Sequence, residues 1–296
     1  MMNFRQALEI SAESTENRLL YHTEKKVGGV EGLDGAIGYS LLGGGKRLRA
    51  YLVQEFCELC NRDREHSVNY ACAIEMVHAF SLIHDDLPSM DNDDMRRGKP
   101  SNHKAFGEAT AILAGDSLAL DAFLIICQNE YCTPNQNEEA VIALSKHSGS
   151  LGMCAGQKID LDGEGKSLDI EELTRLVDLK TGALFSCACM LGCIAANATL
   201  TQKSAAKEFG LLTGRAFQIT DDLLDIHSTP EVLGKTVGKD IESEKSTFVS
   251  LLGEDGAKAF AVECIDKAKN SLEEFGDSSA KERLIAFCDY ILTRKK

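Results

Sequence analysis

Residues 67–86 read SVNYACAIEMVHAFSLIHDD, an apolar segment long enough for about five helical turns that ends in two adjacent acids. The arrangement occurs again at residues 202–227, where a segment with the apolar spacing of a helix leads to Asp221 and Asp222. No convincing alternation of apolar and polar residues, the pattern of half-buried strands, appears anywhere. The sequence therefore predicts an all-α fold in which two helices end in acidic clusters.

The remaining segments fit the same fold class. The chain of 296 residues contains only four prolines, so few positions would break a helix. No linker or change in composition divides it, and we expect residues 1–296 to form a single domain. Further helices are expected at 47–61, 109–131, 138–156, 170–198, 255–275 and 279–294, and polar loops at 87–104, 162–168 and 228–247. Residues 28–45 are glycine-rich, and a loop or helix start is expected at Gly43-Gly44-Gly45.

The overall charge excludes some classes of partner. The formal net charge of −14 would repel nucleic acid and an anionic membrane. It does not exclude an anionic substrate, because divalent metal ions invert the local field. No unbroken apolar run approaches the roughly 20 residues of a membrane span, and the N-terminus lacks the pattern of a signal peptide. We expect no nucleic acid partner, no membrane span and a cytoplasmic location.

The eleven cysteines lie mostly inside apolar segments, which is typical of core residues in a reducing compartment. Two spacings are compatible with zinc: Cys57-x-x-Cys60, and the group Cys187, Cys189 and Cys193. Both occur in apolar helical segments without partner ligands at the usual spacing, so zinc is disfavoured.

The two acidic clusters favour a magnesium site. Asp221 and Asp225 are four residues apart, so both carboxylates project from one helical face. Asp85 and Asp91 are six apart, and Pro88 disrupts the helix between them so that Asp91 can turn back. Carboxylates without soft ligands select Mg²⁺, which binds through one or two of them plus substrate phosphates. The alternative is a solvated acidic helix end, which the negative end of the helix dipole disfavours.

Basic residues that suit a phosphate-containing substrate accompany the acids. Lys46 and Arg49, in GGGKRLR (43–49), share a face at or near a helix N-terminus, and His78 lies two turns before Asp85 on the same face. Arginine clamps a diphosphate through two hydrogen bonds, whereas lysine supplies a point charge. GGGKR is not a P-loop, because no Ser or Thr follows the lysine. The other basic candidates are Arg96, Arg97, Lys180, Lys235, Lys239 and Lys245.

With these motifs the chain resembles the trans-prenyltransferases, the polyprenyl synthetase family, and is most similar to its bacterial-type farnesyl diphosphate synthases. The resemblance spans roughly residues 40–250. It rests on GGGKRLR (43–49), HAFSLIHDDLPSMDNDDMRRGKP (78–100), AILAGD (111–116), GQKIDL (156–161), KTGALF (180–185), GRAFQITDDLLD (214–225), LGKTVGKD (233–240) and EKST (244–247). The six-residue spacing from Asp85 to Asp91 is similar to the bacterial and plant-type form of the family's first aspartate-rich motif.

The resemblance implies a large helical bundle around a deep central cavity, with the two acidic motifs facing each other at its mouth, and a homodimer. It implies three Mg²⁺ ions per site with substrate bound. The implied metal ligands are Asp85, Asp91 and Asp221, with Asp86, Asp222 and Asp225 as further catalytic candidates. The implied isopentenyl diphosphate site is Lys46, Arg49, His78 and Arg97, and the implied allylic diphosphate site is Arg96, Lys180, Thr181, Gln218, Lys235 and Lys245.

The resemblance also implies the reaction: head-to-tail condensation of isopentenyl diphosphate with dimethylallyl or geranyl diphosphate. Phe80 and Ser81, five and four residues before Asp85, are the candidates that set product length. A bulky aromatic there would close the cavity early, which favours the farnesyl product, with geranylgeranyl or geranyl as the alternative. A terpene cyclase and a non-catalytic partner subunit are disfavoured, because both aspartate clusters and Lys46 and Arg49 are intact. A metal phosphohydrolase built on His84 and Asp85 is disfavoured because it needs further histidines at supporting positions, and the seven histidines are scattered.

Overall fold

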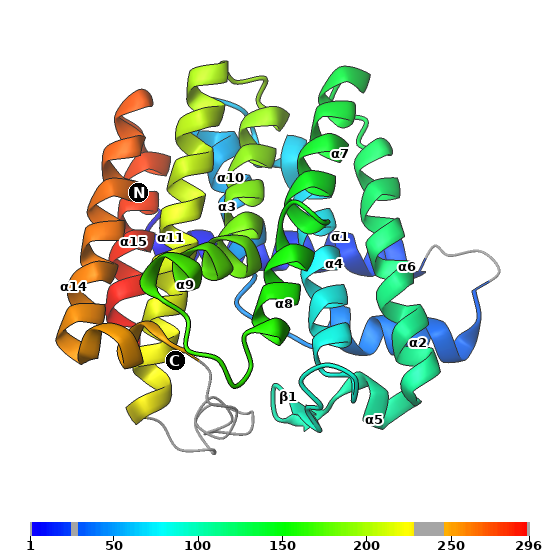
Figure 1. The fold of residues 1–296 in the computed structure, drawn as a ribbon. Coiled ribbons are helices and arrows are strands. Elements are labelled where there is room, and N and C mark those ends of the chain that lie inside the picture. Colours follow the sequence, from blue (N-terminus) through cyan, green and yellow to red (C-terminus); the bar gives the residue numbers. More distant parts are fainter. Residues whose placement is uncertain (1, 25–28, 228–245, 295–296) are drawn as a thin grey trace.

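The computed structural model describes residues 2–24, 29–227 and 246–294, and within them it confirms the predicted all-α fold (Figure 1). A π-helical turn, η2 (Asp178–Gly182), joins two helices, and 3-10 turns occur at η1 (Arg64–Ser67) and η3 (Leu272–Glu274). The α-helices are α1 (Phe4–Glu24), α2 (Glu31–Leu41), α3 (Leu48–Leu59), α4 (Val68–Asp85), α5 (Asn102–Phe106), α6 (Glu108–Cys127), α7 (Pro134–Ser148), α8 (Met153–Asp162), α9 (Ile170–Val177), α10 (Ala183–Ala195), α11 (Leu200–His227), α14 (Phe248–Ser271) and α15 (Ser279–Thr293).

Helices α3, α4 and α10 form the centre of the bundle, and most of their side chains are buried. Their segments are therefore apolar on nearly every side, and each large apolar side chain buried there stabilises the fold by about 1.5–3 kcal/mol. Gly192 lets α10 approach α3 closely, since a Cβ atom there would lie only 2.3 Å from the carbonyl oxygen of Val53. The long helix α11 covers α10 on one side and packs against α14 on the other (Figure 1).

The acidic ends of α4 and α11 lie at the same end of the bundle (Figure 1). Both helices run towards the end at which the small hairpin β1–β2 lies. The fold thus brings together two clusters that are more than a hundred residues apart in the sequence.

The loop predicted at 87–104 contains a short antiparallel hairpin, β1 (Met95–Arg96) and β2 (Lys99–Pro100), that the sequence pattern did not indicate. Its strands have two residues each, too few for a recognisable alternation. The turn residues Arg97 and Gly98 have φ angles of 53° and 75°. Positive φ at both central residues matches the turn type that joins twisted strands through two residues.

Other boundaries also differ from the prediction. The glycine-rich segment 28–45 contains helix α2, and the predicted helix 138–156 is two helices broken between Gly149 and Gly152. The predicted helix 170–198 is α9, η2 and α10, and most of the predicted loop 228–247 lies outside the described residues. The helix predicted from 255 begins at Phe248, because the Thr247 and Ser250 side chains form a capping box.

Two described segments are long and apolar enough to cross a membrane by length and composition alone. They are Glu108–Cys127, with mean hydropathy 1.8, and Ile170–Ala195, with mean hydropathy 1.5. Core helices of water-soluble proteins pass the same test, and 72% of the apolar window in the second segment is buried in the bundle. Length and composition are therefore weak evidence for a membrane span. The first segment, α6, nevertheless presents an apolar surface, because only 39% of its apolar window is buried.

Candidate active site

The first acidic cluster turns back on itself directly after α4. The backbone N–H of Asp91 donates to the carbonyl oxygen of Asp85 at 2.9 Å, and that of Asp93 donates to the carbonyl oxygen of Asp86 at 3.1 Å. Asp85 is the last residue of the helix, and Pro88 stands in the turn that follows. The predicted return of Asp91 towards Asp85 is confirmed.

Burial and neighbouring charges control the protonation of this cluster. Burial raises the pKa of Asp85 from its ordinary 3.8 to about 6; Lys180 opposes the rise and Asp91 adds to it. Burial also raises the pKa of Asp86, against the effect of Arg96. The Arg96 guanidinium forms a hydrogen-bonded ion pair with the Asp86 carboxylate. The Asp86 carboxylate is therefore already engaged by Arg96.

The second acidic cluster lies on the last turns of α11. The Asp222 carboxylate accepts hydrogen bonds from Gln218 Nε2 at 3.0 Å and from the backbone N–H of Phe248 at 3.3 Å, which ties it to the start of α14. Thr181 Oγ1 donates to Gln218 Oε1 at 3.3 Å, so three of the predicted residues form one chain of hydrogen bonds. Asp225 follows one turn later on the same helix.

Asp221 forms a contact that was not predicted from the sequence. Arg294, just after α15, lies 2.7 Å from the Asp221 carboxylate and also donates to the carbonyl oxygen of Phe217. Its guanidinium carbon lies 3.7 Å from the centre of the Phe217 ring, a cation–π geometry. A basic residue near the end of the chain thus covers a predicted metal ligand.

Three of the four residues predicted to bind isopentenyl diphosphate lie close together. Burial lowers the pKa of His78 well below its ordinary value, and the positive charges of Arg49 and Arg97 lower it further. Burial also lowers the pKa of Arg49 to about 10. The carboxylates of Glu75 and Asp221 oppose this shift, and the charge of Arg97 adds to it. His78 is therefore neutral near pH 7 and would meet a phosphate as a hydrogen-bond donor.

Lys46 and Arg97 contact different parts of the molecule. Lys46 is exposed, and its Nζ lies 5.6 Å from the centre of the Tyr290 ring on α15. Arg97, in the turn of the hairpin, donates to the carbonyl oxygen of Gly44. That hydrogen bond joins the GGGKRLR segment to the first acidic loop, 53 residues further along the chain.

Lys180 connects the two halves of the site. Its position in η2, beside Thr181, puts its charge close enough to Asp85 to lower that carboxyl group's pKa, and its Nζ forms an ion pair with Asp160. Asp160, in the GQKIDL segment, is a site residue that the prediction missed, although the motif that contains it was recognised. The predicted Lys235 and Lys245, like Lys239, lie outside the described residues.

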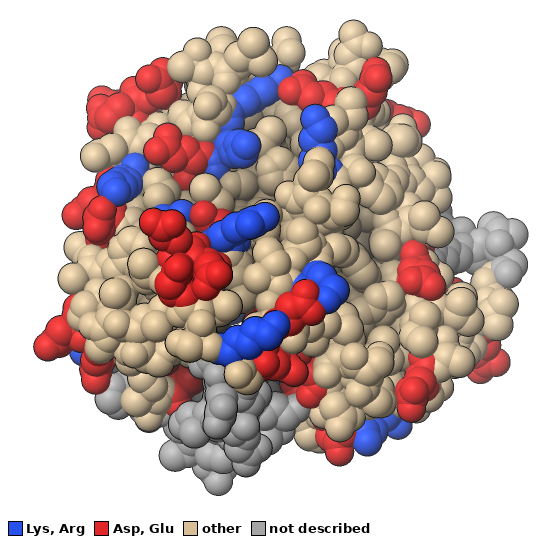
Figure 2. All heavy atoms as spheres, in the orientation of Figure 1, with Lys and Arg blue, Asp and Glu red and all other residues tan. Residues whose placement is uncertain are grey.

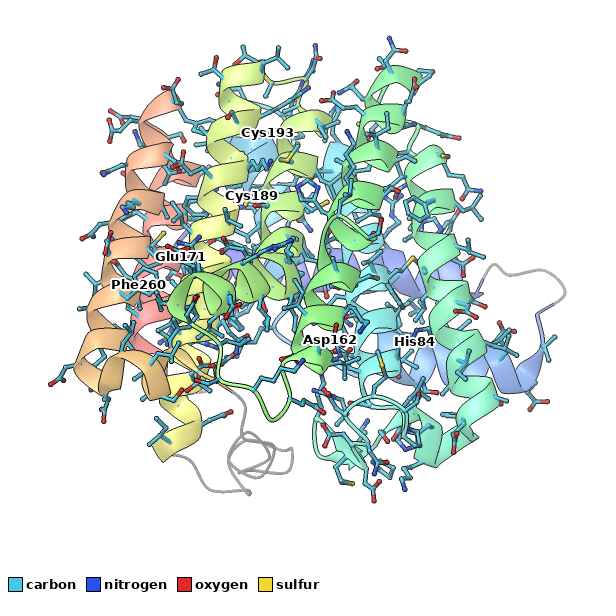
Figure 3. The ribbon with its side chains drawn as sticks, in the orientation of Figure 1. His84, Asp162, Glu171, Cys189, Cys193 and Phe260 are labelled. Atoms are coloured by element: carbon cyan, nitrogen blue, oxygen red, sulfur yellow. The ribbon has the colours of Figure 1, made fainter. Side chains whose placement is uncertain are left out.

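His84 lies against α6, where its Nε2 is 3.9 Å from the carboxylate of Asp116. Its Nε2 lies 3.1 Å from the carbonyl oxygen of Ile112, and its ring packs against Gly115 on α6 (Figure 3). Within the described ranges, no three His, Cys, Asp or Glu side chains form a ready-made metal site. The contacts of His84 with α6 disfavour a phosphohydrolase built on this residue.

The surface around the site is of mixed charge. Figure 2 shows Lys and Arg side chains next to Asp and Glu across the middle of one face, so the net charge of −14 does not make this face uniformly acidic. A small cavity of about 40 Å³ beside the first cluster is lined by Tyr39, Asp86, Arg96 and Arg97, among others. The central cavity that the resemblance implies stays a prediction.

Comparison with known proteins places the chain among well-characterised relatives. The polyprenyl synthetase family model matches residues 30–280. The chain is 43% identical over 302 residues to the chloroplastic geranylgeranyl pyrophosphate synthase of Capsicum annuum (96% of this chain, 82% of the relative). It is 40% identical over 295 residues to the farnesyl diphosphate synthase of Geobacillus stearothermophilus (99% and 98%). The structure of an FPP/GFPP synthase from Zymomonas mobilis matches with a TM-score of 0.86 and 37% identity, covering 98% of this chain and 99% of that one.

The fold is an all-α bundle that places both acidic clusters at one end, with basic side chains close to them. The chain belongs to the polyprenyl synthetase family. It is a prenyltransferase of isoprenoid biosynthesis that elongates prenyl chains.

Proposed function

We propose that this prenyltransferase condenses isopentenyl diphosphate head-to-tail with dimethylallyl and geranyl diphosphates to give farnesyl diphosphate and pyrophosphate. The observation that carries the proposal is the placement of both aspartate clusters at one end of the bundle, where the charge of Lys180 lowers the pKa of Asp85 and that of Asp221 raises the pKa of Arg49. Two relatives named for farnesyl and geranylgeranyl products are similarly close, so geranylgeranyl diphosphate is the second candidate.

The residues present fit Mg²⁺, which we propose as the cofactor, with three ions per site once substrate is bound. Asp85, Asp91 and Asp221 would hold it, because their carboxylates are hard ligands that come from two sides of the site. When bound, Mg²⁺ neutralises charge on the departing diphosphate.

The chain's own residues position the two substrates. Arg49, His78, Arg97 and Lys46 are proposed to clamp isopentenyl diphosphate, two of them through guanidinium groups suited to bidentate hydrogen bonds. Lys180 and the pair Thr181 and Gln218 are proposed to hold the allylic diphosphate, together with Arg96 once it leaves Asp86. Lys235 and Lys245 belong to the same proposed group.

In the reaction, the allylic C–O bond breaks, and the double bond of isopentenyl diphosphate attacks the resulting allylic cation. The proton lost afterwards passes to the departing diphosphate, so no protein base is required. The apolar faces of α4 and α10 exclude water, which would otherwise quench the cation.

Product length is assigned to the α4 segment before Asp85. The Phe80 ring lies 5.3 Å from the His84 ring, and His84 packs on α6, so Phe80 lies on the α6 side of α4. Ser81 Oγ donates to the carbonyl oxygen of His78 at 2.9 Å, which turns it towards its own helix. We propose Phe80 as the residue that closes the path of the growing chain, with Ser81 next to it.

The decisive experiment incubates the protein with isopentenyl and dimethylallyl diphosphates and Mg²⁺ and measures the chain length of the product. We expect farnesyl diphosphate, and a shift to longer products for Phe80→Ala. Asp85→Ala and Asp221→Ala should each lower turnover by about three or more orders of magnitude with the helical circular dichroism retained. Near-normal turnover of both variants contradicts the metal assignment, and an unchanged product for Phe80→Ala places the length control elsewhere.

We further propose that the chain forms a single domain over residues 1–296, acts as a homodimer and works in the cytoplasm. The terminal helices α1 and α15 both pack on the central helix α3, which supports one domain. For the homodimer, support comes from the exposed apolar side chains of α6, which include Leu113, Leu120 and Leu124.

A further inference from the structure

The thiols of Cys60 and Cys193 lie next to each other although 133 residues separate them in the chain. Their Sγ atoms are 3.8 Å apart. Cys60 is the first residue after α3, and Cys193 lies in the last turn of α10, away from the acidic end of the bundle (Figure 3). Neither residue takes part in the proposed reaction.

The close contact of the two helices fixes this separation. A Cβ atom on Gly192 would lie 2.3 Å from the carbonyl oxygen of Val53 and 2.8 Å from the Cβ of Phe56. Because Gly192 has no side chain, the α10 backbone lies directly on α3, and the next residue, Cys193, faces the end of that helix. A disulfide requires a sulfur–sulfur distance of about 2 Å, so the two Sγ atoms must move closer together from 3.8 Å.

The neighbouring cysteines have other partners. Cys57 Sγ lies 3.4 Å from the carbonyl oxygen of Asp63, and Cys132 Sγ lies 3.5 Å from that of His66. These thiols donate to the backbone, whereas the thiols of Cys60 and Cys193 contact each other. All eleven cysteines are free in the structure.

We propose that Cys60 and Cys193 are a redox-active pair that forms a reversible disulfide with a low-molecular-weight disulfide, such as oxidised glutathione, as the oxidant. The Cys60 thiolate attacks the oxidant, forms a mixed disulfide and releases one small thiolate. The Cys193 thiol then loses its proton and attacks Cys60 Sγ, which releases the second small thiolate. The protein loses two electrons and two protons, and the oxidant is reduced to two thiols.

The order of these steps follows from the solvent exposure and the acidity of the two thiols. Cys60 is partly exposed, and the hydrogen bond from Cys193 lowers the pKa of the Cys60 thiol, which favours the attacking thiolate. Cys193 is buried, and burial raises the pKa of its thiol. The small oxidant therefore reaches Cys60 first, and Cys193 completes the exchange from inside the bundle.

The test treats the folded, metal-free protein with oxidised glutathione and maps its peptides by mass spectrometry without reduction. We expect a peptide pair joined through Cys60 and Cys193, about 2 Da lighter than the separate peptides and released by dithiothreitol. Cys57→Ala is the matched control, because it changes the same helix one turn earlier and should leave the crosslink intact. Cys60→Ala should abolish it and leave Cys193 unmodified.

Three outcomes overturn the proposal: a stable mixed disulfide of glutathione at Cys60, a crosslink between Cys57 and Cys60, or an unmodified Cys60. The wild-type map decides among them even if a variant folds poorly. Because the test contains no prenyl substrate, its result is independent of the proposed function.

Discussion

The charged form of Asp85 destabilises the folded protein. The carboxylate lies where burial disfavours its charge, and Asp91 adds like-charge repulsion, so the folded protein binds a proton there more tightly than the unfolded chain does. The folded pKa of about 6 lies above the ordinary 3.8. The favourable contribution of protonated Asp85 to the free energy of unfolding is therefore present at low pH. This contribution is lost as the pH rises through about 6.

The first prediction concerns this residue in metal-free protein. Asp85→Asn should raise the free energy of unfolding at pH 7.5 by roughly 1 to 3 kcal/mol, because the neutral amide avoids the charge that burial disfavours. The gain should vanish near pH 4, where Asp85 is largely protonated. Urea unfolding in the presence of a metal chelator measures both values. A gain that is the same at the two pH values would mean that packing, and not charge, is responsible.

The second prediction concerns Arg294. A guanidinium and a metal ion cannot occupy the same side of the Asp221 carboxylate, so Mg²⁺ must compete with this ion pair. Arg294→Ala should lower the Mg²⁺ concentration that half-saturates the metal-dependent rise in melting temperature, by about two- to fivefold for a partly exposed ion pair. Arg294→Lys is the control that keeps the charge. A higher requirement for Mg²⁺ in Arg294→Ala would show that the arginine supports metal binding instead.

At the scale of elements, the hairpin β1–β2 places the two arginine side chains of the first acidic loop in contact with different partners. Arg96 precedes the turn and reaches back to Asp86, whereas Arg97 lies in the turn and reaches Gly44. Gly98, at φ 75°, completes the turn in a conformation that costs a residue with a side chain about 1–2 kcal/mol. The proposed binding of both diphosphates thus depends on one two-residue turn.

The third prediction follows from that turn. Gly98→Ala should raise the KM for isopentenyl diphosphate by about five- to tenfold, because the strain shifts Arg97 away from Gly44. Gly165→Ala is the matched control, since Gly165 also has a positive φ, 68°, but lies in the loop between α8 and α9. Steady-state kinetics with each substrate varied in turn measures the effect. Equal changes in the two variants would show a general loss of stability.

For the whole molecule, α6 presents several exposed apolar side chains that the described fold does not cover. Leu113, Leu120 and Leu124 are 56%, 71% and 55% exposed, and their spacing puts them on one side of the helix. Exposed apolar patches of this kind mark contact surfaces between proteins. A second copy of the chain is the proposed partner.

The fourth prediction tests this surface. Leu120→Asp should convert the proposed homodimer to monomer at micromolar concentration, because it would bury an unpaired charge in the interface. Leu200→Asp, at a leucine that is 83% exposed at the start of α11, is the control. Light scattering after size-exclusion chromatography measures the mass. A monomeric wild type would refute the homodimer, and a dimeric Leu120→Asp would place the interface elsewhere.

The local features of this protein follow from sequence because they depend on short-range rules. The apolar spacing predicted the helices, and Pro88 predicted the return of Asp91 to Asp85. The sequence also indicated which residues suit metal and phosphate. The hairpin and the break at Gly149–Gly152 were missed, since segments this short carry too little periodicity.

Only the tertiary structure decided which side chains meet. Arg294 lies on Asp221, Asp160 holds Lys180, and Cys193 faces Cys60, and no spacing within one segment predicts any of these pairs. The physical reason is that each pair joins elements remote in the chain, and helix packing sets their separation. The sequence by itself determined the helices and the chemical character of the site, whereas packing determined the partners and the charge state of each group.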